Sequence, residues 1–366
     1  MTFRFRLALL VGLSSTLAAC NGTVDGGVIM DAGGSAIDTG SPPGNDASVD
    51  PDTGVHLFCG DGTCNNGETC GTCDSDCGAC ASVCEGALVG PPNFSGENSG
   101  TAAAGGTAEQ NLALVRANHW RTAAGLPAFN ANVQINTAAQ NHAHFMATTP
   151  DDCHAGAHNE EMSYSGGTCA GFTGQWPWDR MNAAGFEGSA YAEVIDWETG
   201  ANDAVDGWIW TVYHREAFMD VSYNVLGYGT ESDNNVMDFG RQGGSSNSGE
   251  PALFPVPGQT GVKPDFNGLY EGPRPPTPDD GDWPSGTVVS VSFPSDMTIT
   301  SHAIYDADCN PVAHSAHSPA DDANAGDGFF YMYADDPLAS HTTYTAEVHA
   351  MVGGTPWSAV WSFTTQ

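Results

Sequence analysis

Two segments of the chain carry apolar residues at the three- and four-residue spacing that is typical of amphipathic helices. Residues 108–124 form the first segment, and one helical face of it carries Leu112, Val115 and His119. Residues 132–147 form the second, and its apolar face carries Ile135, Ala138, Ala139, His142, Phe145 and Met146. The pattern predicts two helices, and it makes His142 a buried core histidine with a satisfied hydrogen bond.

Apolar and polar residues alternate further along the chain, as they do in half-buried β-strands. Residues 223–229 and 235–240 flank a short polar stretch and predict a β-hairpin, with Val225 and Val236 facing the layer beneath. Residues 251–266 hold too many prolines for regular structure to be expected, and the linker at 271–284 marks a domain boundary.

Alternation returns in residues 285–366, where short apolar runs are separated by Asp, Gly and Pro turns. This pattern predicts a separate all-β sandwich. Its ending, with Thr342-Thr343-Tyr344-Thr345 and Trp361-Ser362-Phe363, is similar to bacterial Ig-like domains, which usually serve as spacers or adhesive modules. His314 and His317 lie near Asp321 and Asp322, and a hydrated loop is favoured there over a metal site.

The N-terminus has the parts of an export signal. Arg4 and Arg6 precede a mostly apolar stretch at residues 7–17, which is too short to span a bilayer, and Leu17-Ala18-Ala19-Cys20 follows. Residues 1–20 thus resemble a bacterial lipoprotein signal, in which cleavage leaves Cys20 lipidated. The resemblance implies an exported protein that Cys20 anchors to the membrane, at the bacterial outer membrane or cell surface. A plainly secreted product is the alternative.

The next segments are poor in apolar residues. Residues 21–56 are predicted to be a disordered acidic tether, and residues 85–107 a second linker. Residues 57–84 hold seven cysteines and need crosslinks in place of a core, so disulfides are favoured over zinc in an oxidising compartment. Acidic residues of this module could ligate Ca²⁺, although their spacing is not that of an EF-hand. The connectivity, and the partners of Cys84 and Cys309, are left open.

Charge narrows the class of partner. The chain of 366 residues has 9 Lys and Arg against 44 Asp and Glu, a formal net charge of −35. Such a charge repels phosphate backbones, which argues against nucleic-acid binding, and it attracts cationic partners and divalent metal ions. Its length and its shifts in composition indicate several domains.

Four residues between positions 153 and 220 are candidate ligands of a divalent metal: His158, Glu160, Glu193 and His214. Neutral imidazoles and carboxylates both suit Zn²⁺, so Zn²⁺ is the expected ion. The alternative is that these polar side chains are simply solvated. His214 lies in a Trp-rich run that is predicted to be helical.

The order of motifs over residues 118–229 resembles the bacterial SCP-like branch of the CAP superfamily. The two predicted helices carry Asn118-x-x-Arg121 and Ala139-Gln140-x-His142. The later motifs are His158, Gly174-x-x-Pro177-x-x-Arg180, Gly185-Phe186, Glu193, Trp208, His214-Arg215 and Leu226-Gly227-Tyr228-Gly229. The resemblance implies an α+β fold: a three-layer α-β-α sandwich over residues 108–270, followed by the all-β Ig-like sandwich. It also implies an open cleft lined by two His and two acidic residues, which bind divalent metal in several relatives.

The match is uneven within this site. Glu193 and His214 match the family pattern, although the Asn that commonly follows the Glu is absent. His158 is preferred over His154 as a ligand because Glu160 follows it in an H-x-E variant, and His154 is kept as the alternative. Cys153 and Cys169 bracket this loop and are expected to form a disulfide.

Three functions of different classes follow. The preferred one is a membrane-tethered extracellular binding module whose cleft holds a divalent metal and a small apolar ligand or a surface protein. The second is a zinc-dependent, peptidase-like hydrolase in which Glu160 or Glu193 acts as the base. The third is a structural surface protein with a vestigial site. The chain has no H-E-x-x-H, G-x-S-x-G or Walker motif, which favours the binding module over an enzyme. The sequence gives no indication of oligomeric state.

Overall fold

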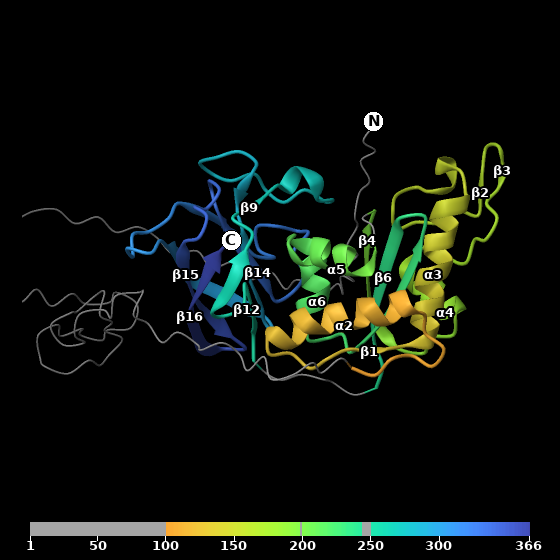
Figure 1. The fold of residues 1–366 in the computed structure, drawn as a ribbon, viewed down its shortest axis with the longest axis horizontal. Helices are drawn as coiled ribbons and strands as arrows, with labels where there is room; N and C mark the ends of the chain where they lie inside the picture. Colours follow the sequence, from red (N-terminus) through yellow and green to blue (C-terminus); the bar gives the residue numbers. More distant parts are fainter. Residues whose placement is uncertain (1–99, 198–199, 244–249) are drawn as a thin grey trace, which may run out of the picture. The chain divides into compact units, whose positions relative to one another are not determined.

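The computed structural model describes residues 100–197, 200–243 and 250–366 (Figure 1). The chain divides into two units, and all of these residues belong to the one that includes Val83–Gln366. The predicted signal, the tether, the cysteine-rich module and most of the second linker lie outside the described residues. No helix in the described ranges has both the length and the apolar character needed to cross a membrane.

A four-stranded sheet in the order β1-β5-β6-β4 forms the centre of the first domain. The predicted hairpin is confirmed as β5 (Val225–Glu231) and β6 (Asn234–Arg241), joined at Ser232 and Asp233, which both have positive φ. This two-residue turn matches the right-handed twist of the strands it joins. The edge strands are β4 (Ser189–Asp196), antiparallel to β6, and β1 (Asn130–Ala131), parallel to β5.

One face of this sheet is covered by α3 (Val133–Thr148) and α4 (Pro177–Ala183). All six residues predicted for the apolar face of α3 are buried. Val225 packs with Ile135, and Val236 packs with Ala139, as the alternation predicted. Asn132 caps α3 by accepting hydrogen bonds from two backbone amides of its first turn. The second predicted helix and its buried face are therefore confirmed.

The opposite face is covered by α2 (Ala108–Ala123), α5 (Ala201–Ile209) and α6 (Tyr213–Met219), which share a hydrophobic cluster with the sheet. The Trp-rich run predicted to be one helix is thus two helices, α5 and α6. Helices on both faces of the sheet form three layers, in the order α-β-α (Figure 1).

The predicted buried face of α2 is wrong. Leu112 and Val115 are 46% and 47% exposed, whereas the buried face combines small alanines and Trp120 with two polar residues, Asn118 and Arg121. Asn118 replaces lost water contacts by pairing with both the backbone N–H and C=O of Phe129. A count of apolar residues could not find this face because two of its members are polar.

The rest of the chain is rich in β-strands. Two four-stranded sheets, β13-β14-β11-β7 and β12-β15-β16-β8, share one hydrophobic cluster. Their longer strands are β11 (Val288–Ser292), β12 (Met297–Tyr305), β13 (His314–His317), β14 (Phe329–Ala334), β15 (Thr343–Val352) and β16 (Thr355–Thr365). Short elements are β2 (Ser163–Tyr164), β3 (Gly167–Thr168), β9 (Asp265–Phe266), β10 (Ser285–Gly286), η1 (Asp151–Cys153) and η2 (Gly268–Tyr270).

The expectation that residues 251–266 lack regular structure is wrong. β7 (Ala252–Phe254) pairs with β11, and β8 (Gln259–Val262) pairs with β16. Prolines are tolerated because they fall beside these edge strands rather than inside them. Two strands of the C-terminal sheets, β7 and β8, therefore lie before the predicted linker at 271–284. The linker does not mark the start of these sheets.

Close packing of α3 on β5 depends on two glycines. A Cβ at Gly227 would lie 2.2 Å from the backbone nitrogen of Asn136, and one at Gly229 would lie 2.2 Å from that of Gln140. Helix backbone cannot give way as a flexible side chain can, so any larger residue must push α3 off the sheet.

We predict that Gly227→Ala lowers the free energy of unfolding by about 1–3 kcal/mol, the usual range for overpacking a core. Urea unfolding followed by tryptophan fluorescence measures this change. Gly156→Ala is the matched control, because the nearest atom to its added Cβ lies 3.8 Å away. Equal stability of the two variants would contradict the packing argument.

Candidate functional site

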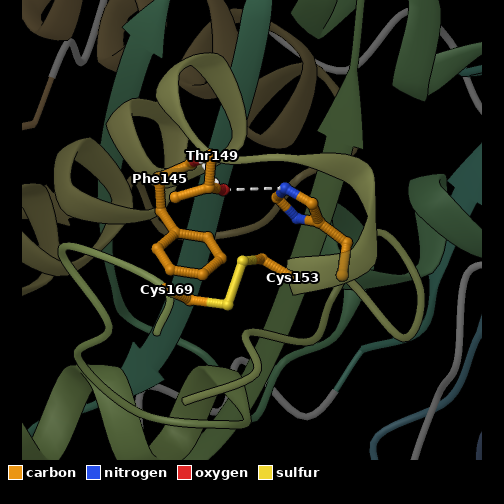
Figure 2. The surroundings of a disulfide bond; sticks show 5 residues. Phe145, Thr149, Cys153 and Cys169 are labelled. Atoms are coloured by element: carbon orange, nitrogen blue, oxygen red, sulfur yellow. Dashed lines mark hydrogen bonds between the residues drawn. A yellow bond between two sulfur atoms is a disulfide. The ribbon is translucent and has the colours of Figure 1, made fainter. Parts of the chain in front are cut away.

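The loop between α3 and α4 is held by a disulfide. Cys153 and Cys169 are bonded, with their Cα atoms 5.8 Å apart and a sequence separation of 16 (Figure 2). The predicted pairing is therefore confirmed. On the chain-entropy model, closing a loop of this size stabilises the fold by about 3 kcal/mol. Cys309 is disulfide-bonded as well. His158 and Glu160 both lie inside the loop that the Cys153–Cys169 bond closes.

His154, the alternative ligand, is held at the C-terminal end of α3. Its Nε2 lies 3.0 Å from Thr149 Oγ1, and its ring packs edge-on against Phe145 with ring centres 5.2 Å apart (Figure 2). These contacts place His154 beside the disulfide. His158, in contrast, contacts the carboxylate of Glu193, so the structure favours His158 as the site residue.

Three buried side chains form the centre of the site: His158, Glu193 and Arg180. His158 Nδ1 lies 2.8 Å from Glu193 Oε1, and the other oxygen of Glu193 accepts a 2.5 Å bond from Arg180 Nη2. Arg180 Nη1 also donates to the carbonyl oxygen of His158, at 3.0 Å. A carboxylate only accepts, so Nδ1 of His158 carries the hydrogen and Nε2 carries the lone pair.

Electrostatics keep Glu193 ionised and His158 neutral. Burial acts to raise the pKa of Glu193, but the charges of Arg180 and His142, with the bond from His158, hold that pKa below its ordinary value. Burial lowers the pKa of His158, and the charges of His214 and His142 lower it further, against the opposing effect of Glu193. A neutral imidazole beside an ionised carboxylate is a suitable metal ligand.

Glu160 has its own set of partners. Its Oε1 lies 3.0 Å from His142 Nδ1, its Oε2 accepts from the backbone N–H of Thr173 at 2.7 Å, and Arg180 Nε is 3.9 Å away. His142 Nε2 lies 2.9 Å from the carbonyl oxygen of Ala157. The prediction of a buried, hydrogen-bonded His142 is confirmed, although its partner is a predicted ligand. Both oxygens of Glu160 are therefore engaged within the protein.

Asp238 on β6 lies opposite Glu193 on β4 in the strand register. Asp238 is fully buried, and neither of its carboxyl oxygens has a well-formed hydrogen bond within the described residues. Burial, and next the negative charge of Glu193, raise the pKa of Asp238 well above its ordinary value, while Arg180 acts in the opposite direction. The pKa values of the two neighbouring carboxyls are thus shifted in opposite directions, that of Glu193 downward and that of Asp238 upward.

His214 lies in the first turn of α6. Its Nδ1 is 3.2 Å from Thr211 Oγ1 and 3.4 Å from Glu271 Oε1. Thr211 donates its own hydrogen to the carbonyl oxygen of Trp208, so its oxygen accepts from His214. Glu271 also accepts from the backbone N–H groups of Val212 and Tyr213, at 2.9 and 2.6 Å. Nδ1 is therefore the anchored nitrogen of His214, as it is for His158.

The C-terminal strands hold the other sides of α6. Arg215 is fully buried and donates from Nη1 to the carbonyl oxygen of Val288 at 2.9 Å. Tyr213 donates its hydroxyl hydrogen to Asp322 at 2.7 Å, and Glu216 accepts from the backbone N–H of Gly326 at 3.1 Å. The helix that carries His214 is thus positioned by residues from beyond the first domain.

The structure brings the four predicted ligands together only in part. His158 and Glu193 are bonded, and Arg180 connects them to Glu160. Within the ranges that the structure describes, His214 makes no hydrogen bond or ion pair with the other three, and no three His, Cys, Asp or Glu side chains form a group that could hold a metal. The charge of His214 nevertheless acts to lower the pKa of His158.

Sequence reasoning missed three contributors: Arg180 as an ion-pair partner, Asp238 and Glu271. Arg180 was visible only as part of a motif. For Asp238, the available signal was a charged residue between the apolar Met237 and Phe239 of β6. Nothing in the sequence marked Glu271, which lies in the predicted linker.

A known protein family matches part of the chain. Residues 114–239 match the model of the CAP family, described as the cysteine-rich secretory protein family. No curated protein matches the chain. Among solved structures, the chain is similar to an extracellular protein with an SCP domain from Bacillus anthracis str. Ames, at 19% identity and a TM-score of 0.30. That similarity covers 37% of this chain and 40% of the other, so the chain spans less than half of that neighbour.

The raised pKa of Asp238 makes a pH-dependent prediction. In the unfolded chain this carboxyl ionises above its ordinary pKa of 3.8, whereas burial raises its pKa in the fold, so the destabilisation that Asp238 causes grows as pH rises. We expect Asp238→Asn to stabilise the protein at pH 7 and to lose this advantage on acidification to pH 4. The slope of the difference should not exceed about 1.4 kcal/mol per pH unit.

Urea unfolding of the wild type and the variant across this pH range measures the difference. Asp233→Asn is the control, because Asp233 lies in the exposed hairpin turn. The groups that face Asp238 are Glu193, Arg180 and Glu160, and they are unchanged in both variants. A variant that is less stable than the wild type at pH 7 would show that Asp238 is ionised and needed.

Proposed function

We propose that this chain is an extracellular CAP/SCP-type binding module whose His158 and His214 bind a divalent metal, with Zn²⁺ as the expected ion. One observation carries the proposal. Each imidazole is anchored through Nδ1 beside a carboxylate, Glu193 for His158 and Glu271 for His214. Metal-binding histidines commonly have this arrangement, in which a carboxylate orients the ring and leaves Nε2 as the ligand.

The donor set fits a metal in part. Among the described residues, neither His158 nor His214 uses Nε2 in a hydrogen bond, so both lone pairs are available. Glu193 fits better as the group that orients His158 than as a ligand, since Arg180 and His158 occupy its two oxygens. Glu160 does not fit as a ligand, because His142 and Thr173 occupy both of its oxygens. Water would complete the coordination.

The charge state of Glu193 favours binding over hydrolysis. A bound Zn²⁺ would supply a Lewis acid at this position. A general base works best with a pKa near the working pH, whereas Arg180, His142 and His158 hold the pKa of Glu193 low against the effect of burial. Glu193 is therefore a weak candidate for the base of a hydrolase, and Glu160 is a weak candidate because His142 and Thr173 already engage both of its oxygens.

The remaining parts of the proposal rest on the sequence. The predicted export signal and Cys20 support a lipid-anchored protein at the bacterial surface. The small apolar ligand and the surface-protein partner stay predictions. A surface cavity of about 260 Å³ lies between residues 104–107, α2 and α3, and none of the four predicted ligands lines it.

We predict that Zn²⁺ raises the melting temperature of the wild-type protein, because an ion that binds only the folded state stabilises it by about 2.7 kcal/mol at a hundred times its Kd. His158→Asn and His214→Asn should each abolish most of this shift. The matched control is His144→Asn, an exposed histidine paired with Glu231. The same zinc-dependent shift in all three variants, or no shift in the wild type, refutes the site.

The role of Glu193 has a separate test. Glu193→Gln keeps the shape of the side chain but weakens the acceptor for His158, so zinc affinity measured by calorimetry should fall by about 10–100-fold rather than vanish. Melting without zinc shows whether the variant still folds. Complete loss of zinc from a folded variant would instead assign Glu193 as a direct ligand.

A further inference from the structure

Two histidines meet at the edge of the C-terminal sheets, far in sequence from the CAP domain. His302 lies on β12 and His314 on β13, and these are the edge strands of the two four-stranded sheets. His302 Nδ1 is 2.9 Å from His314 Nε2, and the two rings are nearly perpendicular, with an angle of 83° between their planes. His302 is exposed and His314 half-buried, so solvent ions can reach the pair.

The turn that joins the two strands places the rings opposite each other. Tyr305 pairs with Pro311 in an antiparallel bridge, so His302 and His314, each three residues further from the turn, fall at facing positions. Asp306 closes the turn by accepting hydrogen bonds from the backbone N–H groups of Asp308 and Asn310, at 2.9 and 2.8 Å. The two imidazoles are therefore brought together by backbone structure before any ligand binds.

The hydrogen bonds also define the tautomers. His314 Nδ1 is 2.8 Å from the carbonyl oxygen of Val312, which can only accept, so this nitrogen carries the hydrogen. His314 Nε2 then has a lone pair, and it accepts the hydrogen on His302 Nδ1. A ligand histidine commonly donates its other ring nitrogen to a backbone carbonyl in this way.

From this geometry we propose that His302 and His314 form a second metal site, in which Nδ1 of His302 and Nε2 of His314 bind one transition-metal dication. Zinc–nitrogen bonds of 2.0–2.1 Å in a tetrahedron place two nitrogens about 3.4 Å apart, so the rings need to separate by only about 0.5 Å. The exposed His302 side chain can make this movement by rotation about its side-chain torsions.

Binding of the metal to His302 needs no added base, because the ring loses one hydrogen and gains another. When the metal takes Nδ1 of the neutral His302, the hydrogen of that nitrogen is lost to solvent and another is gained at Nε2, so the ring stays neutral. Burial lowers the pKa of His302, which favours its neutral ring, while Asp321 opposes this effect. Water fills the other coordination positions, since Asp321 is bonded to Ser318 and paired with His317.

Copper(II) is the ion for the experiment, because imidazole pairs bind it more tightly than other first-row dications and it broadens nearby NMR signals. Histidine ring resonances of the full-length protein are assigned by single substitutions and followed as Cu²⁺ is added. We expect the His302 and His314 signals to broaden together and at lower Cu²⁺ than those of His341, an exposed histidine in the turn before β15.

Single substitutions give the decisive comparison. In His302→Asn the remaining His314 ring should need about a hundredfold more Cu²⁺ for the same broadening, because the second ligand of a chelating pair is gone. His341→Asn is the control, since asparagine tolerates the positive φ of 53° at that position. Unchanged near-ultraviolet circular dichroism confirms that each variant folds.

The proposal is overturned if His302 and His314 broaden no earlier than His341, or if His302→Asn leaves the response of His314 unchanged. The signals of His158 and His214 report on the CAP domain in the same spectra. Failure of His158 and His214 to bind metal is therefore distinguishable from failure of this second site.

Discussion

The site depends on one buried guanidinium. Arg180 is 1% exposed, and its two terminal nitrogens reach the Glu193 carboxylate and the carbonyl oxygens of His158 and Gln175. Burying such a charge costs several kcal/mol, which only a closely fitted set of acceptors can offset. Because those acceptors belong to β4, to the disulfide-closed loop and to the start of α4, the guanidinium determines how these three segments fit together.

The second half of the site depends on the C-terminal strands. The start of α6 is capped by Glu271, its buried Arg215 donates to the carbonyl oxygen of Val288, and Tyr213 donates to Asp322. A spacer domain would need none of these contacts with its neighbour. The orientation of His214 therefore follows from the packing of both parts of the chain, and a fragment cut at residue 239, where the match to the family model ends, would lack these contacts.

Local periodicity predicted the elements whose partners lie near in sequence. The apolar face of α3 and the β5–β6 hairpin were correct because large apolar residues and a two-residue turn determine them directly. The buried face of α2 was wrong because Asn118 and Arg121 are buried through hydrogen bonds to backbone groups, which no apolar count detects.

The same reason explains the missed strands and site residues. β7 and β8 form sheet only with strands that follow tens of residues later, so their short segments carry no pattern of their own. In the site, His158 and Glu193 could be named from a motif. Arg180 neutralises Glu193 through a contact across 13 positions, and Glu271 anchors His214 through a contact across 57 positions. Spacing alone does not reveal such contacts. Motifs thus named the candidate site residues, while the charges around them depend on the fold.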